Sequence, residues 1–423
     1  MTLEHFISLD FVSPTKLYSP RTIAPVRQPR KQVHMPSEVV NSILEYAYFD
    51  DDLEVDTEVL RACSLVCREW TATAQKLLFK HVTLRTQAAY QSFCTTVTQN
   101  TTYSRMLAEC VVRLRVVLDH NQPFGLTQDM FAHAVTLCPS LFELSVAIYG
   151  CGAPGQDVIG APDVSRMARK APSFEESTLA MLRTGPTIQA LQVNNWSENS
   201  TSVAQLLEVW PELQCLIIGG TPPELNAQPS SPPAFPGSLR ELHLNFQTSP
   251  SVDFFGWLLH NSQESLNTLR IERPLPVDVV EHLLHTTRNS LRSLSLPSAS
   301  QRLTQALGEC TVLKDFSVDG SYVSPRVLRG LPANVEHLGF TIETPILEAV
   351  RQKEKLRAIT VFVPQHAPEG STDCYAQLAP LQLVCAERGI DMYTTSNIRR
   401  LRNMMVSLFQ LSLHGQRVHY CVS

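Results

Sequence analysis

The sequence predicts an α/β chain in which a short N-terminal helical segment precedes a curved solenoid with a parallel sheet. Two observations carry this prediction. A short apolar motif recurs between residues 111 and 361, and residues 35–84 place apolar side chains at helical spacing. In addition, a chain of 423 residues is too long for one compact core, whereas a solenoid grows by adding repeats.

Composition points to an intracellular protein. Hydrophobic residues make up 43% of the chain, charged residues 18%, and the formal net charge is −5. No stretch approaches the roughly 20 apolar residues of a membrane helix, and the weak apolar run Phe6–Val12 is interrupted by Asp10, unlike a secretory signal. The 11 cysteines contain no CxxC pair, which favours reduced thiols buried as small hydrophobes. We therefore expect the cytoplasm, the nucleus or both.

Changes in composition and in apolar periodicity divide the chain into four segments. Residues 1–33 are rich in proline and lack apolar periodicity, so we expect them to be disordered. Residues 34–84 form the helical segment, residues 85–395 the repeat region, and residues 396–423 a C-terminal cap or tail, in which residues 398–411 have a helical pattern.

The helical segment is predicted to contain three helices. Met35-Pro36-Ser37-Glu38 is typical of a helix start, because proline suits a first turn and an acidic residue suits the positive end of the dipole. After an acidic run near residues 50–57, a second helix is expected over 59–70. A third, through 74–79, leads into a strand at 82–84.

The repeat region carries ten copies of one motif, in which apolar residues occupy the first, fourth and sixth positions. The copies begin at Val111, Leu141, Ile188, Leu213, Leu239, Leu266, Leu291, Leu313, Val335 and Leu356. Their first positions are 30, 47, 25, 26, 27, 25, 22, 22 and 21 residues apart, and the interval of 47 has room for one degenerate copy. This spacing is typical of leucine-rich repeats, although the consensus asparagine after each motif is missing.

Stacking would let each repeat cover the apolar face of its neighbour and build a parallel sheet. The segments 202–209, 277–284 and 300–307 are predicted to return the chain as helices. The stretch 221–237, which holds six prolines, is predicted to be a loop.

Residues 35–84 resemble the F-box. Met35-Pro36-x-Glu38-Val39-x-x-x-Ile43-Leu44 matches its opening, Leu65-Val66-Cys67-Arg68-x-Trp70 its second hallmark, and Leu78-Phe79-x-x-Val82 its exit into a strand. The acidic run near residues 50–57 is a departure from the family pattern, because it lengthens the gap between the two halves. The whole arrangement is similar to that of fungal F-box proteins with irregular leucine-rich repeats.

This resemblance implies a non-catalytic role as substrate receptor of a Skp–cullin–F-box ubiquitin ligase. Its F-box would bind a Skp-type adaptor and, through it, a cullin scaffold. The positions that the resemblance assigns to adaptor binding are Met35, Pro36, Val39, Ile43, Leu44, Leu65, Val66, Cys67 and Trp70. About half of them are expected to face the partner and the rest to pack within the fold, since three short helices have little core of their own.

A protein target would bind to the outward-facing positions of the repeat strands. These positions are polar and carry both signs of charge, and the candidates are Arg115, Glu143, Gln192, Glu241, His243, Arg270 and Glu272. For any one of them, the competing interpretation is a solvated sheet face. The basic clusters at 27–31 and 399–402 are short and lack stacking aromatics, so neither nucleic acid nor a membrane is an expected partner.

No motif indicates a catalytic, cofactor or metal site. His282 and His285 lie at metal-ligand spacing but have no third ligand in register. The glycine-rich stretch 150–155 lacks the Gly-Lys-Ser/Thr ending of a phosphate loop and is predicted to be a plain loop. Two alternatives stay open: an F-box scaffold or regulatory protein that acts without target ubiquitination, and an enzyme with an unrecognised site.

Overall fold

The computed structural model describes most of the segment between residues 35 and 403. The described residues are 35–48, 56–151, 169–225, 234–320, 323–341, 346–363 and 373–403. The tail at 1–33, most of the acidic run, most of the glycine-rich stretch and the region after residue 403 lie outside the described residues.

The chain divides into two compact units, which are described separately. Unit 1 ends at Phe142 and also includes Ala180–Pro186, and unit 2 comprises the remainder. The three N-terminal helices and the first repeat thus belong to one unit.

Unit 1 begins with three helices, here called the hook (residues 35–80). They are α1 (Ser37–Tyr46), α2 (Thr57–Ser64) and α3 (Arg68–Lys80). Their shared core consists of Val40, Leu44, Tyr48, Leu60, Ala74 and Leu77, with Cys63, Trp70 and Leu78 packed against it.

The prediction of one helix over 59–70 is wrong, because the chain breaks between α2 and α3. Cys67 is fully extended, with φ −161° and ψ 168°. The hydroxyl of Thr71 donates to the carbonyl of Ser64 at 2.6 Å and so closes the break. Turns of this kind satisfy carbonyls that a helix end leaves unpaired.

The rest of unit 1 starts the parallel sheet. It contains β1 (His81–Leu84), α4 (Gln87–Thr98), α5 (Thr102–Cys110), β2 (Arg113–Asp119) and α6 (Gln128–Thr136). The strand predicted at 82–84 is confirmed, and it pairs in parallel with β2, with Val82 opposite Leu114.

Unit 2 repeats a strand and a return segment. Its strands are β3 (Glu143–Tyr149), β4 (Ala190–Trp196), β5 (Cys215–Gly220), β6 (Glu241–Phe246), β7 (Thr268–Ile271), β8 (Ser293–Leu296), β9 (Asp315–Val318), β10 (His337–Thr341), β11 (Ala358–Phe362) and β12 (Asp391–Thr395). Its helices are α9 (Thr201–Val209), α10 (Val252–Leu259), α11 (Val277–Thr287), the 3-10 turn η1 (Gln301–Leu303), α12 (Thr304–Glu309), α13 (Pro325–Gly330), α14 (Leu347–Gln352), α15 (Asp373–Arg388) and α16 (Ile398–Asn403). Helix α8 (Glu176–Arg183) has residues in both units.

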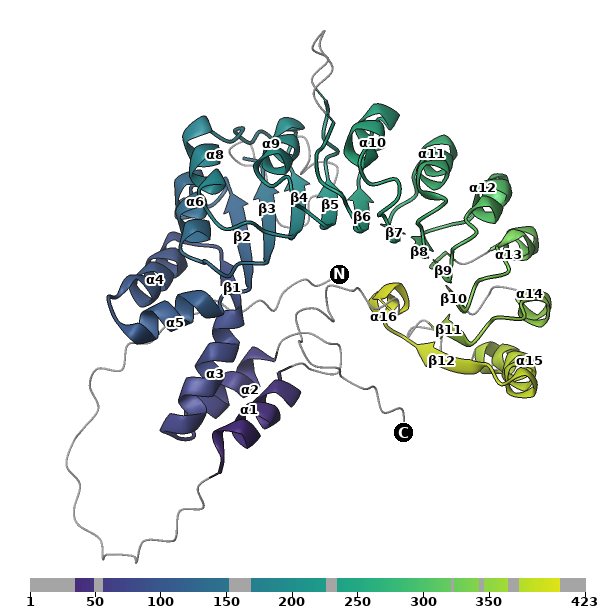
Figure 1. Cartoon of the computed structure of the whole chain (residues 1–423), viewed down its shortest axis with the longest axis horizontal. Coiled ribbons are helices and arrows are strands. Elements are labelled where there is room, and N and C mark those ends of the chain that lie inside the picture. The colour runs from purple at the N-terminus through teal and green to yellow at the C-terminus, as the bar shows by residue number, and fades with distance from the viewer. Residues whose placement is uncertain are drawn as a thin grey trace, which may run out of the picture. The chain divides into compact units, whose positions relative to one another are not determined.

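Among the described residues, β1 and β2 of unit 1 pair in parallel, and in unit 2 each strand from β3 to β12 pairs in parallel with the next strand in the chain. In unit 2 the strands lie on the inner side of an arc and helices α9 to α15 on its outer side (Figure 1). This placement follows from the motif, since its thirty apolar positions are all buried, with at most 5% of each residue exposed. The α/β solenoid with a parallel sheet is therefore confirmed.

Among the described residues, no strand of the sheet lies between β3 and β4, which the interval of 47 residues separates in the chain. Strand β3 pairs directly with β4 over seven residues, from Glu143 opposite Ala190 to Tyr149 opposite Trp196. The suggestion of a degenerate copy is thus wrong, because an intervening copy would have to separate these two strands.

The predicted return helices are confirmed as α9, α11 and the pair η1 and α12. Several return helices begin at a hydroxyl cap: Thr127 accepts from Met130 N at 3.3 Å and Ser251 from Phe254 N at 3.2 Å. Such caps satisfy amides at a helix start and fix where the helix begins.

Serine hydroxyls bridge some neighbouring repeats, in which the consensus asparagine is missing. The hydroxyl of Ser262 accepts from Leu239 N at 2.9 Å, and that of Ser290 donates to the carbonyl of Gln263 at 2.8 Å. They satisfy backbone groups in the loops before the strands. The stack therefore does not depend on the usual side chain.

Candidate functional site

The hook exposes large apolar side chains in two segments. On α1 the exposed fraction is 44% for Val39, 41% for Ile43 and 91% for Tyr46. Between α2 and α3 it is 86% for Leu65 and 62% for Val66. Together with Met35, these residues are called the hook surface. Exposed apolar clusters of this kind mark binding sites more often than isolated ones do.

Helical spacing explains the part of the hook surface that lies on α1. Val39, Ile43 and Tyr46 are four and three residues apart and so share one face of the helix, while Val40 and Leu44 face the hook core. The exposed face borders a shallow hollow lined by Glu38, Val39, Ser42, Ile43, Tyr46 and Ala47. Sequence reasoning missed Tyr46, although this spacing could have revealed it.

Leu44 must be reassigned from the predicted adaptor-binding set. It is fully buried in the hook core and cannot touch a partner. Trp70 is partly buried and packs against the same core, so most of its role is also internal. Pro36 and Cys67 are exposed and stay within reach of a partner.

The predicted target-binding residues fall in both units. Arg115 is half-buried on β2 of unit 1. The other six lie in unit 2, within or at the ends of β3 to β7: Glu143, Gln192, Glu241, His243, Arg270 and Glu272. The register places His243 directly opposite Arg270, two positions along from the pair Glu241 and Thr268.

Three of these residues are buried, so the interpretation of a solvated sheet face does not hold for them. The exposed fraction is 1% for Glu241 and 8% for both His243 and Arg270. Burial is the main cause that holds the pKa of His243 well below its usual value, and the positive charge of Arg270 adds to this effect. The ring is therefore neutral at pH 7. The concave face of β6 and β7 is thus a covered polar surface.

Helix α16 packs against β10, β11 and β12 on the same inner side of unit 2, and its Arg402 joins two acidic side chains that follow β7 and β9. Its Nε donates to Asp319 Oδ2 at 2.6 Å, and its Nη1 lies 3.5 Å from Glu272 Oε2. Arg270 in turn donates through Nη2 to the carbonyl of Arg402. The sequence showed only a short basic cluster at 399–402, and Asp319 was missed because no local pattern links residues 83 positions apart.

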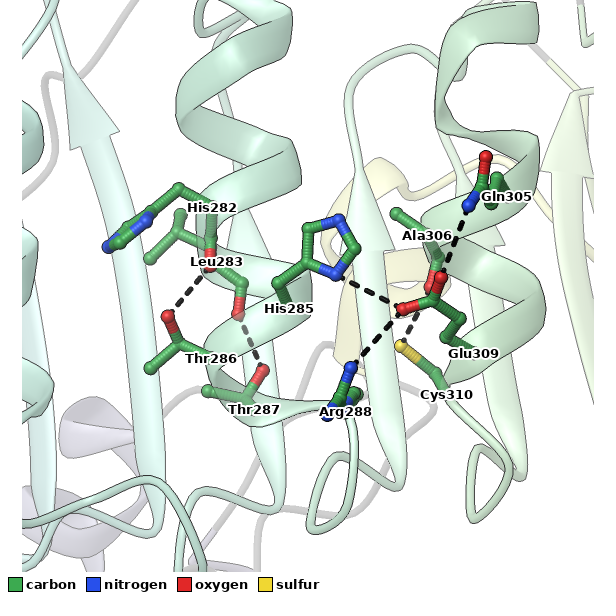
Figure 2. A network of polar contacts seen from close by, with 10 residues as sticks. All are labelled: His282, Leu283, His285, Thr286, Thr287, Arg288, Gln305, Ala306, Glu309 and Cys310. Carbon is green, nitrogen blue, oxygen red and sulfur yellow. Dashed lines mark hydrogen bonds and ion pairs between the residues drawn. The ribbon is translucent and has the colours of Figure 1, made fainter.

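A metal site at His282 and His285 finds no support in the described residues. His285 Nδ1 lies 3.1 Å from Glu309 Oε2, which also lies 3.5 Å from Arg288 Nη1, whereas His282 points away from both (Figure 2). The part of the chain that the structure describes has no group of three or more His, Cys, Asp or Glu side chains arranged to hold a metal ion. This network joins neighbouring return helices on the outer side.

Buried cysteines in the described repeats are poor nucleophiles. Burial raises the pKa of the Cys138 thiol to about 12 and that of Cys310 to about 11. Cys94 lies 4.0 Å from His133 Nδ1, but burial raises the pKa of this thiol as well. Because the reactive species is the thiolate, these side chains act as small apolar residues.

Parallel strands in chain order, with buried repeat positions and returning helices, define a leucine-rich-repeat solenoid. No known protein family and no curated protein matches the sequence. Among solved structures, the chain is similar to the protein in the crystal structure of a TLR13–ssRNA13 complex, at 11% identity and a TM-score of 0.35. The match covers 70% of this chain and 41% of that one, so the chain spans less than half the length of that relative. At this level of similarity, the fold assignment rests on the strands and repeats of this chain.

None of the described helices is long and apolar enough to span a membrane.

Proposed function

We propose that the chain is the non-catalytic substrate receptor of a Skp–cullin–F-box ubiquitin ligase. The hook surface binds a Skp-type adaptor, which links the chain to a cullin, and the concave face of unit 2 binds a protein target. The observation that carries this proposal is the exposure of Val39, Ile43 and Leu65 on a three-helix segment with a small core. Such a segment gains stability by covering apolar surface with a partner.

Two further features support the proposal. The exposed residues fall within the two motifs that resemble the F-box, residues 35–44 and 65–70. The concave face offers polar side chains of both charges, which suits a protein target better than a lipid or a phosphate backbone. The cytoplasm or the nucleus is the compartment in which such a ligase would act.

Adaptor binding is tested by co-purifying the full chain with a Skp-type adaptor. Replacing Val39, Ile43 or Leu65 by Ser should weaken the complex by about 2 kcal/mol each, or about 30-fold in Kd. Val252→Ser is the matched control, because Val252 is 41% exposed on α10 in unit 2 and should leave adaptor binding unchanged. Full binding by the hook variants, or no binding by the folded wild-type chain, would refute the proposal.

Leu44→Ala separates folding from binding. This change should cost about 2–5 kcal/mol of hook stability, because it leaves a cavity in the core. Adaptor binding would then fall together with the helical signal of the hook, whereas Leu65→Ser should lower binding while that signal stays.

Target turnover is tested in cells that carry the hook variants. If the chain is a substrate receptor, a protein bound to the concave face should accumulate when adaptor binding is lost. An unchanged level of that protein would favour a scaffold or regulatory role.

A further inference from the structure

Helix α16 packs on the inner face of unit 2 through one buried side chain. Leu401 is 1% exposed and lies over Gly339 of β10, where an added Cβ would come within 3.1 Å of Leu401 Cδ1. Figure 1 shows α16 inside the arc beside β11 and away from the outer row of helices. The helix therefore covers part of the concave face.

Small side chains make this close approach possible. Ser295 of β8, Ser317 of β9 and Gly339 of β10 lie side by side in one row of the sheet. In the same row, His243 and Arg270 occupy the neighbouring strands β6 and β7. The row thus changes from large polar residues to a trough of small ones, and α16 lies where the trough reaches β10.

Two acidic groups, Glu272 after β7 and Asp319 after β9, lie on one side of this trough and bind the arginine of α16. The side chain of Asp319 is only 8% exposed, and a buried carboxylate needs a cation or hydrogen-bond donors to offset its lost hydration. Arg402 supplies both, since its Nε and Nη2 donate to Asp319 while its Nη1 approaches Glu272. Arg270 donates to the carbonyl of Arg402, at the helix end where a cation is favoured.

The contacts of α16 are few for an element of this fold. It has six residues, and Leu401 is the one buried apolar side chain among those described on it. By contrast, the return helix α11 buries Val279, Val280, Leu283 and Leu284. The described part of α16 makes few apolar contacts, so its position depends on the trough and on its short connection to β12, which ends at Thr395.

We propose that the trough and its acidic pair, Asp319 and Glu272, form the target-recognition site, and that α16 occupies this site in cis. The ligand is a short helical peptide segment whose last turn carries a leucine followed by an arginine. The leucine enters the trough at Gly339, the arginine binds the two carboxylates, and Arg270 binds the final carbonyl. This inference rests on the proposed receptor function and names the kind of target it would accept.

An occupant held in cis makes the site selective. Because α16 follows β12 after two residues, its effective concentration at the trough is high, and a competing segment has to bind more strongly or in several places at once. Arginine-bearing peptides that bind weakly are therefore excluded from the trough by α16. Nucleic acid is disfavoured as well, since the two carboxylates would repel phosphate.

The test uses the full chain and a fluorescent peptide with the sequence of residues 396–405. The wild-type chain should bind this peptide weakly, because α16 covers the site. Leu401→Ala with Arg402→Ala should release α16 and tighten peptide binding by about tenfold or more. Arg402→Gln alone keeps the leucine contact and should give a smaller gain in peptide affinity. This variant replaces the double variant in the test if the double variant folds poorly.

Asp319→Asn in the released chain should weaken peptide binding by about tenfold or more. Asp315→Asn, the same change at the first residue of β9, is the matched control for Asp319, which directly follows β9, and should have no effect on peptide binding. Equal peptide binding by the wild-type and released chains would overturn the inference, as would undiminished binding after Asp319→Asn.

Adaptor co-purification of the same variants separates the two proposals. A chain that binds the adaptor but shows no peptide binding after release of α16 would refute the inference alone. A chain that binds the peptide through Asp319 but never binds the adaptor would refute the ligase role and leave the trough as a recognition site.

Discussion

Asp315 begins β9 and Asp319 directly follows it, but the two side chains have different environments. The carboxylate of Asp319 binds Arg402. Asp315 is 32% exposed in its side chain, lies 4.0 Å from His337 Nδ1 and has no arginine at its carboxylate among the ion pairs of the described residues. Burial raises the pKa of Asp315 to about 6, the charge of Glu336 adds to this effect, and Lys314 opposes it.

This pKa shift predicts that Asp315→Asn stabilises the chain at neutral pH. The folded pKa lies above the unfolded value of about 3.9, so the folded state holds more protons between about pH 4 and pH 6. Stability is therefore lost as pH rises through that window, and the loss persists at pH 7. With allowance for partial exposure, the amide should add about 1 kcal/mol at pH 7.

Urea denaturation at pH 7 and near pH 4 measures this effect. The gain should be present at pH 7 and should be much smaller near pH 4, where the folded carboxyl group is protonated and the unfolded one is about half protonated. An equal gain at both values would mean that the substitution acts through packing and not through charge.

Burial also explains which positions of the hook can bind. Leu44 and Ile43 are neighbours in the sequence and both match the F-box pattern, but one is fully buried and the other is 41% exposed. The motif marks both as apolar and says nothing of the direction in which each points. The helix phase decides the direction, because adjacent residues lie about 100° apart around the axis.

At the scale of the element, α2 depends on Asp56, the residue directly before it, for a defined start. The carboxylate of Asp56 accepts from Val59 N at 2.9 Å and from Glu58 N at 3.1 Å. These bonds satisfy two amides that have no partner inside the helix, and the negative charge suits the helix N-terminus.

Asp56→Ala should therefore destabilise α2 by about 1 kcal/mol, whereas Asp56→Asn should cost only a few tenths. Amide hydrogen exchange of residues 57–64 measures this difference directly. If the alanine variant keeps full protection over α2, packing on Leu60 and not the cap determines the helix start.

The helix break at residues 65–67 matters for the same element. Sequence periodicity continues through the break, which is why one long helix was expected. The extended backbone at Cys67 lets Leu65 and Val66 turn outward, where they form the second part of the hook surface. A continuous helix would have placed them at other angles around its axis.

At the scale of the whole molecule, each repeat is stabilised by its neighbours in the stack. Leu294 of β8 is fully buried, and β8 pairs with β7 and β9. In such arrays stability is a sum of repeat and nearest-neighbour contributions. A cavity in one repeat should therefore weaken its neighbours more than distant repeats.

Leu294→Ala should cost about 2–5 kcal/mol, and loss of amide protection should be largest in β7, β8 and β9. Val312 precedes β9 and is 36% exposed. Val312→Ala should therefore change stability by less than about 0.5 kcal/mol. Equal loss of protection in β3 and β9 would show that unit 2 unfolds as one cooperative body.

The sequence by itself determined the repeat architecture. The ten motifs predicted the strands, the return helices and the buried positions, because apolar spacing within a short segment is a local property and stacking is the one way to bury it. The resemblance to the F-box indicated that the hook has apolar residues that its own core does not bury. The ligase role inferred from this resemblance stays a prediction.

Only the tertiary structure decided which of these residues are available to a partner. It buried Leu44 and exposed Tyr46, withdrew Glu241, His243 and Arg270 from water, and brought Arg402 to Asp319. These outcomes depend on contacts between distant segments and on the phase of each helix, for which the spacing of residues along one segment carries no information.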